Sequence, residues 1–354
     1  MEIIFFKIAL ILIIFLISLG MAAYSTYGER KIAAFLQDRI GPDRAGPFGL
    51  LQPIADGTKM FLKEEIIPNV SNKWLFILGP CIFMVTALMT SAVIPWGLPL
   101  EFGGVKYNLQ IADINIGILY VLGVVGLGVY GVMIGGWASN NKFALLGAIR
   151  ASSQMISYEL AMGMSVIAIL LMNNGSLSIN TMVESQGTGK LYGFINISGM
   201  NWNVFYQPVA CLIFIICAFA ECNRTPFDLA ESESELIGGF HTEYSSMKLG
   251  LYLFAEYINM FISATVISCM FFGGYNFPGI AYLQEILPAN IVSLISIAVL
   301  FGKIIFFIFF FMWVRWTIPR FRYDQLMRLG WQVLMPLSII NMLITGAVLI
   351  WFNN

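Results

Sequence analysis

Eight apolar stretches dominate this chain, and each comes close to the length that a helix needs to cross the hydrocarbon core of a membrane, about 20 residues. Only 11% of the residues are charged, against about a quarter in a typical soluble domain. The sequence therefore predicts an all-α, polytopic membrane protein with about eight transmembrane helices, folded as a single integral membrane domain over residues 1–354. The expected spans lie near 3–27, 74–95, 112–136, 155–172, 207–221, 247–273, 290–314 and 331–352.

Lysine and arginine are concentrated in alternate loops. The junctions 28–73, 137–154, 222–248 and 315–330 hold 15 of the 19 basic residues. The opposite side, which includes both termini, holds Lys7, Lys106 and Lys190, and Lys303 falls inside a span. Because basic loops stay on the cytoplasmic side, we expect these four loops to face the cytoplasm, or an organelle matrix, and both termini to face outward.

The first of these inner loops contains a short amphipathic segment. Pro53 stands at a plausible helix start, and Ile54, Gly57 and Phe61 share one helical face, whereas Asp56 lies on the other. This pattern is typical of a helix that lies in the membrane interface. We therefore expect one interfacial helix in the first cytoplasmic loop.

Two familiar motif types are ruled out by their context. Residues 126–131 match the glycine pattern of dinucleotide-binding loops, but they lie within a span, without the preceding strand that the motif requires. Gly131 and Gly135 instead have the spacing that lets two membrane helices approach closely. The five cysteines form no C-x₂-C pair and His241 is the only histidine, so we expect no metal and no redox cofactor to be bound by this chain alone.

Several ionisable residues are expected inside the membrane, where a charge costs about 2.5–3.5 kcal/mol and usually has a function. Glu256 and Lys303 fall near the midplane, where their opposite charges would allow them to pair. Glu159 is expected one turn into the fourth span, and Glu221 closes the fifth. Each residue alone is as well explained by a satisfied ion pair or by a side chain that reaches the interface. Together they favour proton transfer, because buried carboxylates can take up and release protons.

The densest group of carboxylates follows the fifth span. It comprises Glu221, Asp228, Glu231, Glu233 and Glu235, with Arg224 as the only cation among them. A solvated charge run is the usual explanation for such a segment. Here Phe227 and Leu229 add apolar anchors beside the membrane, which favours a proton reservoir or a redox-sensitive switch.

At these residues the sequence resembles a known family. The segment 221–244 resembles the signature loop of one family of membrane subunits of bacterial NADH–quinone oxidoreductases, whose mitochondrial counterpart is NADH dehydrogenase subunit 1. Ser232 stands where the family usually has glycine, which can alter the backbone of this loop but leaves its carboxylates in register. The matches follow the family order from about residue 24 to 336, and the other matching segments are 29–31, 39–42, 50–56, 136–140, 156–159 and 319–327.

The resemblance implies a role in a proton-translocating NADH–quinone oxidoreductase, respiratory complex I, in a bacterial inner membrane. The enzyme activity would belong to the whole complex, with quinone as substrate. Peripheral partner subunits would carry the iron–sulfur clusters, FMN and NADH, and antiporter-like membrane subunits would complete the proton path. No nucleic acid is expected among the partners.

The resemblance also implies roles for individual residues. The mouth of a quinone tunnel would be lined by Glu29, Arg30, Gln52 and Asp56, with Arg224 and Phe227 nearby. Quinone reduction would be sensed by Asp228, Glu231, Glu233 and Glu235, and protons would pass along Glu221, Glu159 and Glu256.

Two other functions remain open. The equivalent subunit of a membrane-bound hydrogenase would tolerate loss of the tunnel-mouth residues, yet all four are present. A stand-alone secondary transporter would show an internal repeat with paired broken spans, and we find no convincing repeat.

Overall fold

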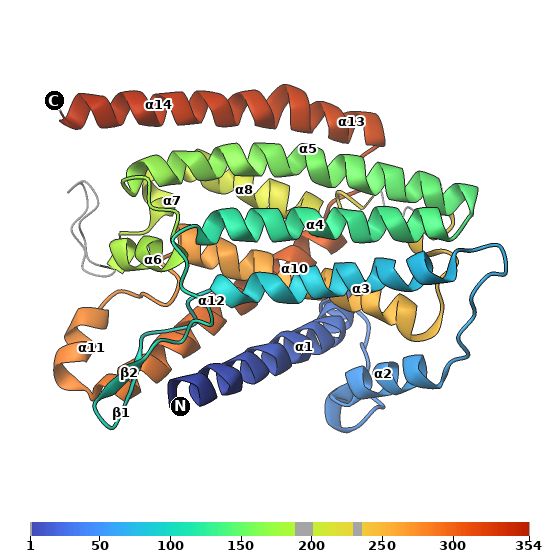
Figure 1. Ribbon diagram of the computed structural model, residues 1–354, viewed down its shortest axis with the longest axis horizontal. Coiled ribbons are helices and arrows are strands. Elements are labelled where there is room, and N and C mark those ends of the chain that lie inside the picture. The colour runs from blue at the N-terminus through green and yellow to red at the C-terminus, as the bar shows by residue number, and fades with distance from the viewer. Residues whose placement is uncertain (1, 188–200, 229–235, 354) are drawn as a thin grey trace.

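The computed structural model describes residues 2–187, 201–228 and 236–353. Glu231, Glu233 and Glu235 therefore lie outside the described residues. Long helices run side by side along the longest axis of the molecule (Figure 1). Within the described residues, seven helices are long and apolar enough to cross a membrane, so the predicted all-α polytopic fold is confirmed. Their bounds are α1 Glu2–Leu36, α3 Lys73–Met89, α4 Gly117–Ala138, α5 Lys142–Met172, α10 Ser246–Phe271, α12 Ala289–Thr317, and α13 Tyr323–Arg328 continued by α14 Met335–Asn353.

The fifth predicted span is a shorter, interrupted helix. Helix α8 (Pro208–Glu221) has 14 residues, and the one-turn helix α7 (Asn203–Tyr206) precedes it. The break falls at Gln207, since the following proline begins a new helix and its ring fixes the backbone there. The Gln207 amide is held by α14, whose Asn341 and Thr345 lie 2.9 and 2.8 Å from it.

Helix α5 begins earlier than its apolar run suggested. It starts at Lys142, where the side chain of Asn141 accepts a hydrogen bond from the amide of Phe143 and so caps the helix. Residues such as Arg150 and Gln154 interrupt the apolar pattern without breaking the helix. Glu159 therefore lies not one turn but 17 residues into its helix, about 26 Å from the start at 1.5 Å per residue.

The two ends of the bundle differ in what they carry (Figure 1). One end carries the amphipathic helix α2 (Gln52–Leu62), as predicted for the first inner loop, and α13. The other carries both ends of the chain, α6 (Ile179–Gly187), α11 (Ile280–Ile286) and a hairpin of β1 (Leu100–Phe102) and β2 (Val105–Tyr107). We call these the α2 end and the hairpin end.

The glycines of α4 serve helix packing, as expected. A Cβ on Gly131 would lie 2.8 Å from the amide nitrogen of Phe83 in α3. The hydroxyl of Tyr252, from α10, donates to the carbonyl of Gly131 at 3.0 Å and also abuts Gly135. The close approach of three helices thus depends on missing side chains in α4.

A single π-helical turn, Leu329–Leu334, joins α13 to α14. It packs on α5: Gly330 faces the ring of Tyr158, and the indole of Trp331 donates to the hydroxyl of Ser157 at 3.1 Å. The hydroxyl of Tyr158 donates to the carbonyl of Leu326 at 2.9 Å.

Candidate functional site

A cavity of about 290 Å³ lies near the α2 end, between α1, α2 and α10. Its lining combines charged groups with apolar side chains. The residues that line it are Ala23, Thr26, Glu29, Arg30, Ala33, Arg39, Pro53, Asp56, Gly57, Met60, Gly250, Leu253, Phe254, Tyr257 and Trp316. Three of the predicted tunnel-mouth residues, Glu29, Arg30 and Asp56, are therefore brought together in one cavity.

An ion pair at the rim of this cavity ties α2 to α1. Nη1 of Arg30 lies 2.7 Å from Oδ2 of Asp56, and the two side chains are 47% and 25% exposed. The amide of Gln52 donates to the other oxygen of Asp56 at 3.2 Å. Gln52 thus acts on the cavity through Asp56, which it orients one helical turn away.

A more deeply buried network surrounds Glu29. One carboxylate oxygen lies 2.5 Å from Arg315 of α12. The other accepts a hydrogen bond from the hydroxyl of Tyr257 at 2.8 Å and lies 3.4 Å from Arg224. Because an unpaired buried charge is strongly destabilising, these three partners make it possible for Glu29 to remain ionised beside the cavity.

Arg224 links this network to Glu256. Its guanidinium lies over the ring of Tyr257, 4.1 Å from the centroid, and 3.9 Å from the carboxylate of Glu256. The Arg224 side chain is 6% exposed and the Glu256 side chain 4%. Arg224 therefore lies behind the cavity, between two buried carboxylates, and reaches it through Glu29 and Tyr257.

Phe227 is separated from this cavity. It packs on Tyr158 and Phe321, with ring centroids 5.3 and 5.7 Å away. It lines a different hollow of about 660 Å³, almost wholly apolar, between α8 and α12. The structure thus places Phe227 apart from the other predicted tunnel residues.

Asp228 is buried where two inner loops meet. Its carboxylate lies 3.0 Å from Nη2 of Arg320 and is 2% exposed. The amide of Phe321 donates to the carbonyl of Pro226 at 3.1 Å. Gln154 of α5 fastens the same loop, because its amide donates to the carbonyl of Phe227 at 2.7 Å.

Glu159 and Glu221 lie on the neighbouring helices α5 and α8, which pack along their length. Glu221 is buried at the end of α8, 8% exposed, whereas Glu159 is half-buried. The two carboxylates are near enough to interact electrostatically. They form a pair that is distinct from the Glu29–Arg224–Glu256 network.

Lys303 is not the partner of Glu256 in the described part of the chain. Its ammonium donates to the carbonyls of Phe272, Gly274 and Asn276 at 2.6–2.7 Å. These carbonyls close the hairpin end of α10, where the helix dipole is negative. Lys303 uses its three N–H groups there, so we interpret it as a cap of α10.

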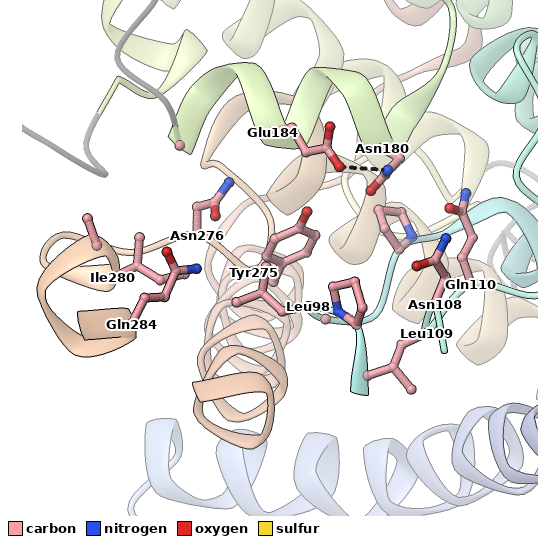
Figure 2. A pocket seen from close by; sticks show the side chains of 15 residues that line it. Leu98, Asn108, Leu109, Gln110, Asn180, Glu184, Tyr275, Asn276, Ile280 and Gln284 are labelled. Carbon is pink, nitrogen blue, oxygen red and sulfur yellow. Dashed lines mark hydrogen bonds between the residues drawn. The ribbon is translucent and has the colours of Figure 1, made fainter. Parts of the chain in front are cut away.

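A second cavity, of about 440 Å³, lies at the hairpin end. Figure 2 shows Tyr275 in its middle, below Glu184, whose carboxylate accepts a hydrogen bond from Asn180 at 2.9 Å. Burial and the nearby Glu184 carboxylate raise the pKa of the Tyr275 phenol. Most of the polar lining is amide, from Asn108, Gln110, Asn180, Asn276 and Gln284. This cavity therefore does not suit a ligand with a long apolar tail.

Comparison with known proteins shows the family. The NADH dehydrogenase family model matches residues 8–346. The chain belongs to the NADH dehydrogenase family. Similar proteins include an NADH-quinone oxidoreductase subunit of Flavobacterium johnsoniae, 62% identical over 97% of this chain and 95% of that protein. A subunit of the same name from Cytophaga hutchinsonii is 62% identical over 98% and 97% of the two chains, and NADH-quinone oxidoreductase subunit 8 of Rhodothermus marinus is 44% identical over 97% of each.

Membership of the NADH dehydrogenase family confirms the resemblance drawn from the sequence motifs. It does not by itself assign roles to residues, and the contacts above add four that the sequence reasoning missed. These residues are Gln154, Tyr257, Arg315 and Arg320. Arg315 and Arg320 entered only the charge count that set the topology, and Tyr257 carried no signal beyond its place beside Glu256.

No metal site is evident in residues 2–187, 201–228 and 236–353, where no three His, Cys, Asp or Glu side chains are grouped so as to hold an ion. In this member of the NADH dehydrogenase family, the described polar side chains are arranged instead as ion pairs and hydrogen bonds around one cavity.

Proposed function

We propose that this chain is the membrane subunit of a proton-translocating NADH–quinone oxidoreductase, which receives quinone in the cavity between α1, α2 and α10. The relatives named above are subunits of NADH-quinone oxidoreductases. The seven long apolar helices support a multi-pass membrane subunit. We place it in a bacterial inner membrane with both termini outward, because the basic loops lie opposite to the termini.

The observation that carries this proposal is the mixed lining of the cavity. A quinone has two carbonyl oxygens, which accept hydrogen bonds, and a long apolar tail. Arg30 and Tyr257 offer donors at one side, and Leu253, Phe254 and Trp316 offer apolar surface. The cavity lies beside the amphipathic helix α2, where a ligand dissolved in the membrane would enter.

Coupling to proton movement follows from the charges behind the cavity. Reduction of a quinone consumes two electrons and two protons, so charge changes at the ligand before protons arrive. At a separation of 4 Å and an effective dielectric constant of 20, unit charges interact by about 4 kcal/mol. A charge change at Glu29 is therefore felt by Arg224 and, through it, by Glu256.

Two further steps complete the proposal. Electrons would come from peripheral subunits that hold NADH, FMN and iron–sulfur clusters. Protons would leave along Glu256, Glu221 and Glu159 toward antiporter-like membrane subunits. Asp228, with Glu231, Glu233 and Glu235 of the same loop, would respond to the reduction through Arg320 and the adjoining loop.

The experiment is to fill the cavity in the assembled complex. Gly57 lines it, and a Cβ at that position meets nothing within 4 Å. We expect Gly57→Phe to reduce NADH-driven quinone reduction strongly, while NADH oxidation by an artificial electron acceptor stays normal. Thr58→Phe is the matched control, because Thr58 is the next residue of α2 and lines the open surface on the other side. Normal quinone reduction by Gly57→Phe would place the quinone elsewhere.

A further inference from the structure

The carboxylate of Glu159 rests directly on the backbone of α4. A Cβ built on Gly126 would lie 2.8 Å from Oε1 of Glu159, 3.1 Å from Oε2 and 3.3 Å from Cδ. Ordinary contacts of a Cβ atom are 3.4–4 Å. The carboxylate therefore occupies the space that any other residue at position 126 would fill.

This contact is what holds the Glu159 side chain in place within the described part of the chain. Among those residues, Glu159 forms no hydrogen bond and no ion pair, in contrast to Glu29, which has three polar partners. Glutamate has three rotatable side-chain bonds, so its carboxylate could otherwise move by several ångströms. The surface of α4 limits that movement on one side.

Gly126 also lies at the right depth to matter. It is nine residues from the start of α4, about 14 Å along the helix at 1.5 Å per residue. Glu159 is 13 residues from the end of α5 at the same end of the bundle, about 20 Å by the same rise. Both positions are well inside the membrane, where no bulk water is available to carry a proton in place of the side chain.

We propose that Gly126 is a positioning residue for proton transfer through Glu159, because it leaves the space that holds the carboxylate near Glu221. This inference rests on the proposed function, in which both carboxylates carry protons. A methyl group at position 126 would push the carboxylate away from α4 by several tenths of an ångström or more. Proton transfer needs groups or a bridging water within hydrogen-bond reach, and a displacement of about 1 Å can reduce a rate by about a hundred-fold.

The decisive variant is Gly126→Ala in the complete complex, studied in inverted membrane vesicles. Alanine is a better helix former than glycine, so this change does not weaken α4 itself. We expect proton pumping and coupled quinone reduction to fall by about ten-fold or more, with NADH oxidation by an artificial acceptor unchanged. Gly123→Ala is the control: it adds the same methyl group to the same helix, where nothing lies within 4 Å. Equal losses in both variants would overturn the inference.

A second variant tests the mechanism instead of the position. Glu159→Asp draws the carboxylate back by one methylene, away from position 126. In the double variant Gly126→Ala/Glu159→Asp, we therefore expect the alanine to cause no loss beyond that of Glu159→Asp alone. Losses that simply multiply would show that the methyl group acts without touching Glu159, and would overturn the inference.

Failure of this inference is distinguishable from failure of the proposed function. If Glu159→Gln lowers pumping while Gly126→Ala pumps normally, only the role of Gly126 is overturned. If Glu159→Gln itself pumps at the wild-type rate, Glu159 carries no proton and the proposed path is overturned with the inference.

Discussion

The guanidinium of Arg224 lies 3.4 Å from the carboxylate of Glu29, although both side chains are less than one-tenth exposed. These residues come from opposite ends of the sequence, one at the inner end of α1 and the other just after α8. Buried ion pairs of this kind gain little stability, yet breaking one by removing a single partner costs about 3–5 kcal/mol. The pair therefore fixes α1 against the loop that begins the acidic segment.

Asp56→Leu tests the rim of the cavity. The substitution removes the partner of Arg30, a half-exposed ion pair for which about 1 kcal/mol is the upper end. We expect the apparent KM for quinone to rise about five-fold, with NADH oxidation by artificial acceptors intact. Lys59→Leu places the same side chain on α2 outside the cavity and should leave KM unchanged. Equal loss of both activities in Asp56→Leu would point to failed assembly.

Glu221→Gln tests the proton path at its most buried carboxylate. Glutamine matches the size of glutamate but cannot carry the proton, so we expect pumping and coupled quinone reduction to fall by about a hundred-fold. Glu101→Gln, in the exposed hairpin pair with Lys106, should pump normally. Proton uptake by vesicles measures both variants, and wild-type pumping by Glu221→Gln would remove this residue from the path.

Lys303→Met tests whether this buried lysine caps a helix or carries protons. Methionine fills similar space but leaves three carbonyls without their donor, at about 1–3 kcal/mol for each unsatisfied group. We expect a complex that inactivates faster on heating, with an unchanged KM for quinone and an unchanged ratio of protons to NADH in the fraction that survives. Lys106→Met, at an exposed ion pair, should alter none of these. A lower ratio of protons to NADH in Lys303→Met would contradict its role as a cap.

Arg320→Met tests the bond between the two inner loops. It leaves the buried carboxylate of Asp228 without its 3.0 Å partner, for which we expect a loss of about 3–5 kcal/mol in stability. The neighbouring pair of Arg322 with Asp324 is exposed, so Arg322→Met should change stability by no more than about 1 kcal/mol. The temperatures at which the two variants lose activity compare them, and equal losses would show that Asp228 is held in another way.

The sequence predicted the helices well because hydropathy acts over long runs. It missed the true start of α5, since Arg150 and Gln154 end the apolar pattern without ending the helix. Backbone hydrogen bonds and the cap at Asn141 decide where a helix starts, and neither depends on hydropathy.

The partners of buried charges were harder to predict. Depth alone suggested that Lys303 and Glu256 would pair, but depth does not say which way a side chain points around its helix. Lys303 reaches the end of α10, and Glu256 faces Arg224, which comes from a loop. Such choices depend on the packing of helices far apart in sequence.

The π-helical turn at Leu329–Leu334 has a consequence for the history of the chain. Such a turn holds about one residue more than a turn of α-helix, so it is equivalent to a one-residue insertion within a continuous helix. Each residue of an α-helix advances the side chains by about 100°. Deleting one residue here would keep α14 in register with α5 but rotate α13 by about that angle, which would carry the Leu326 carbonyl away from Tyr158. The chain is therefore constrained in length at this joint as strictly as it is constrained in residue type elsewhere.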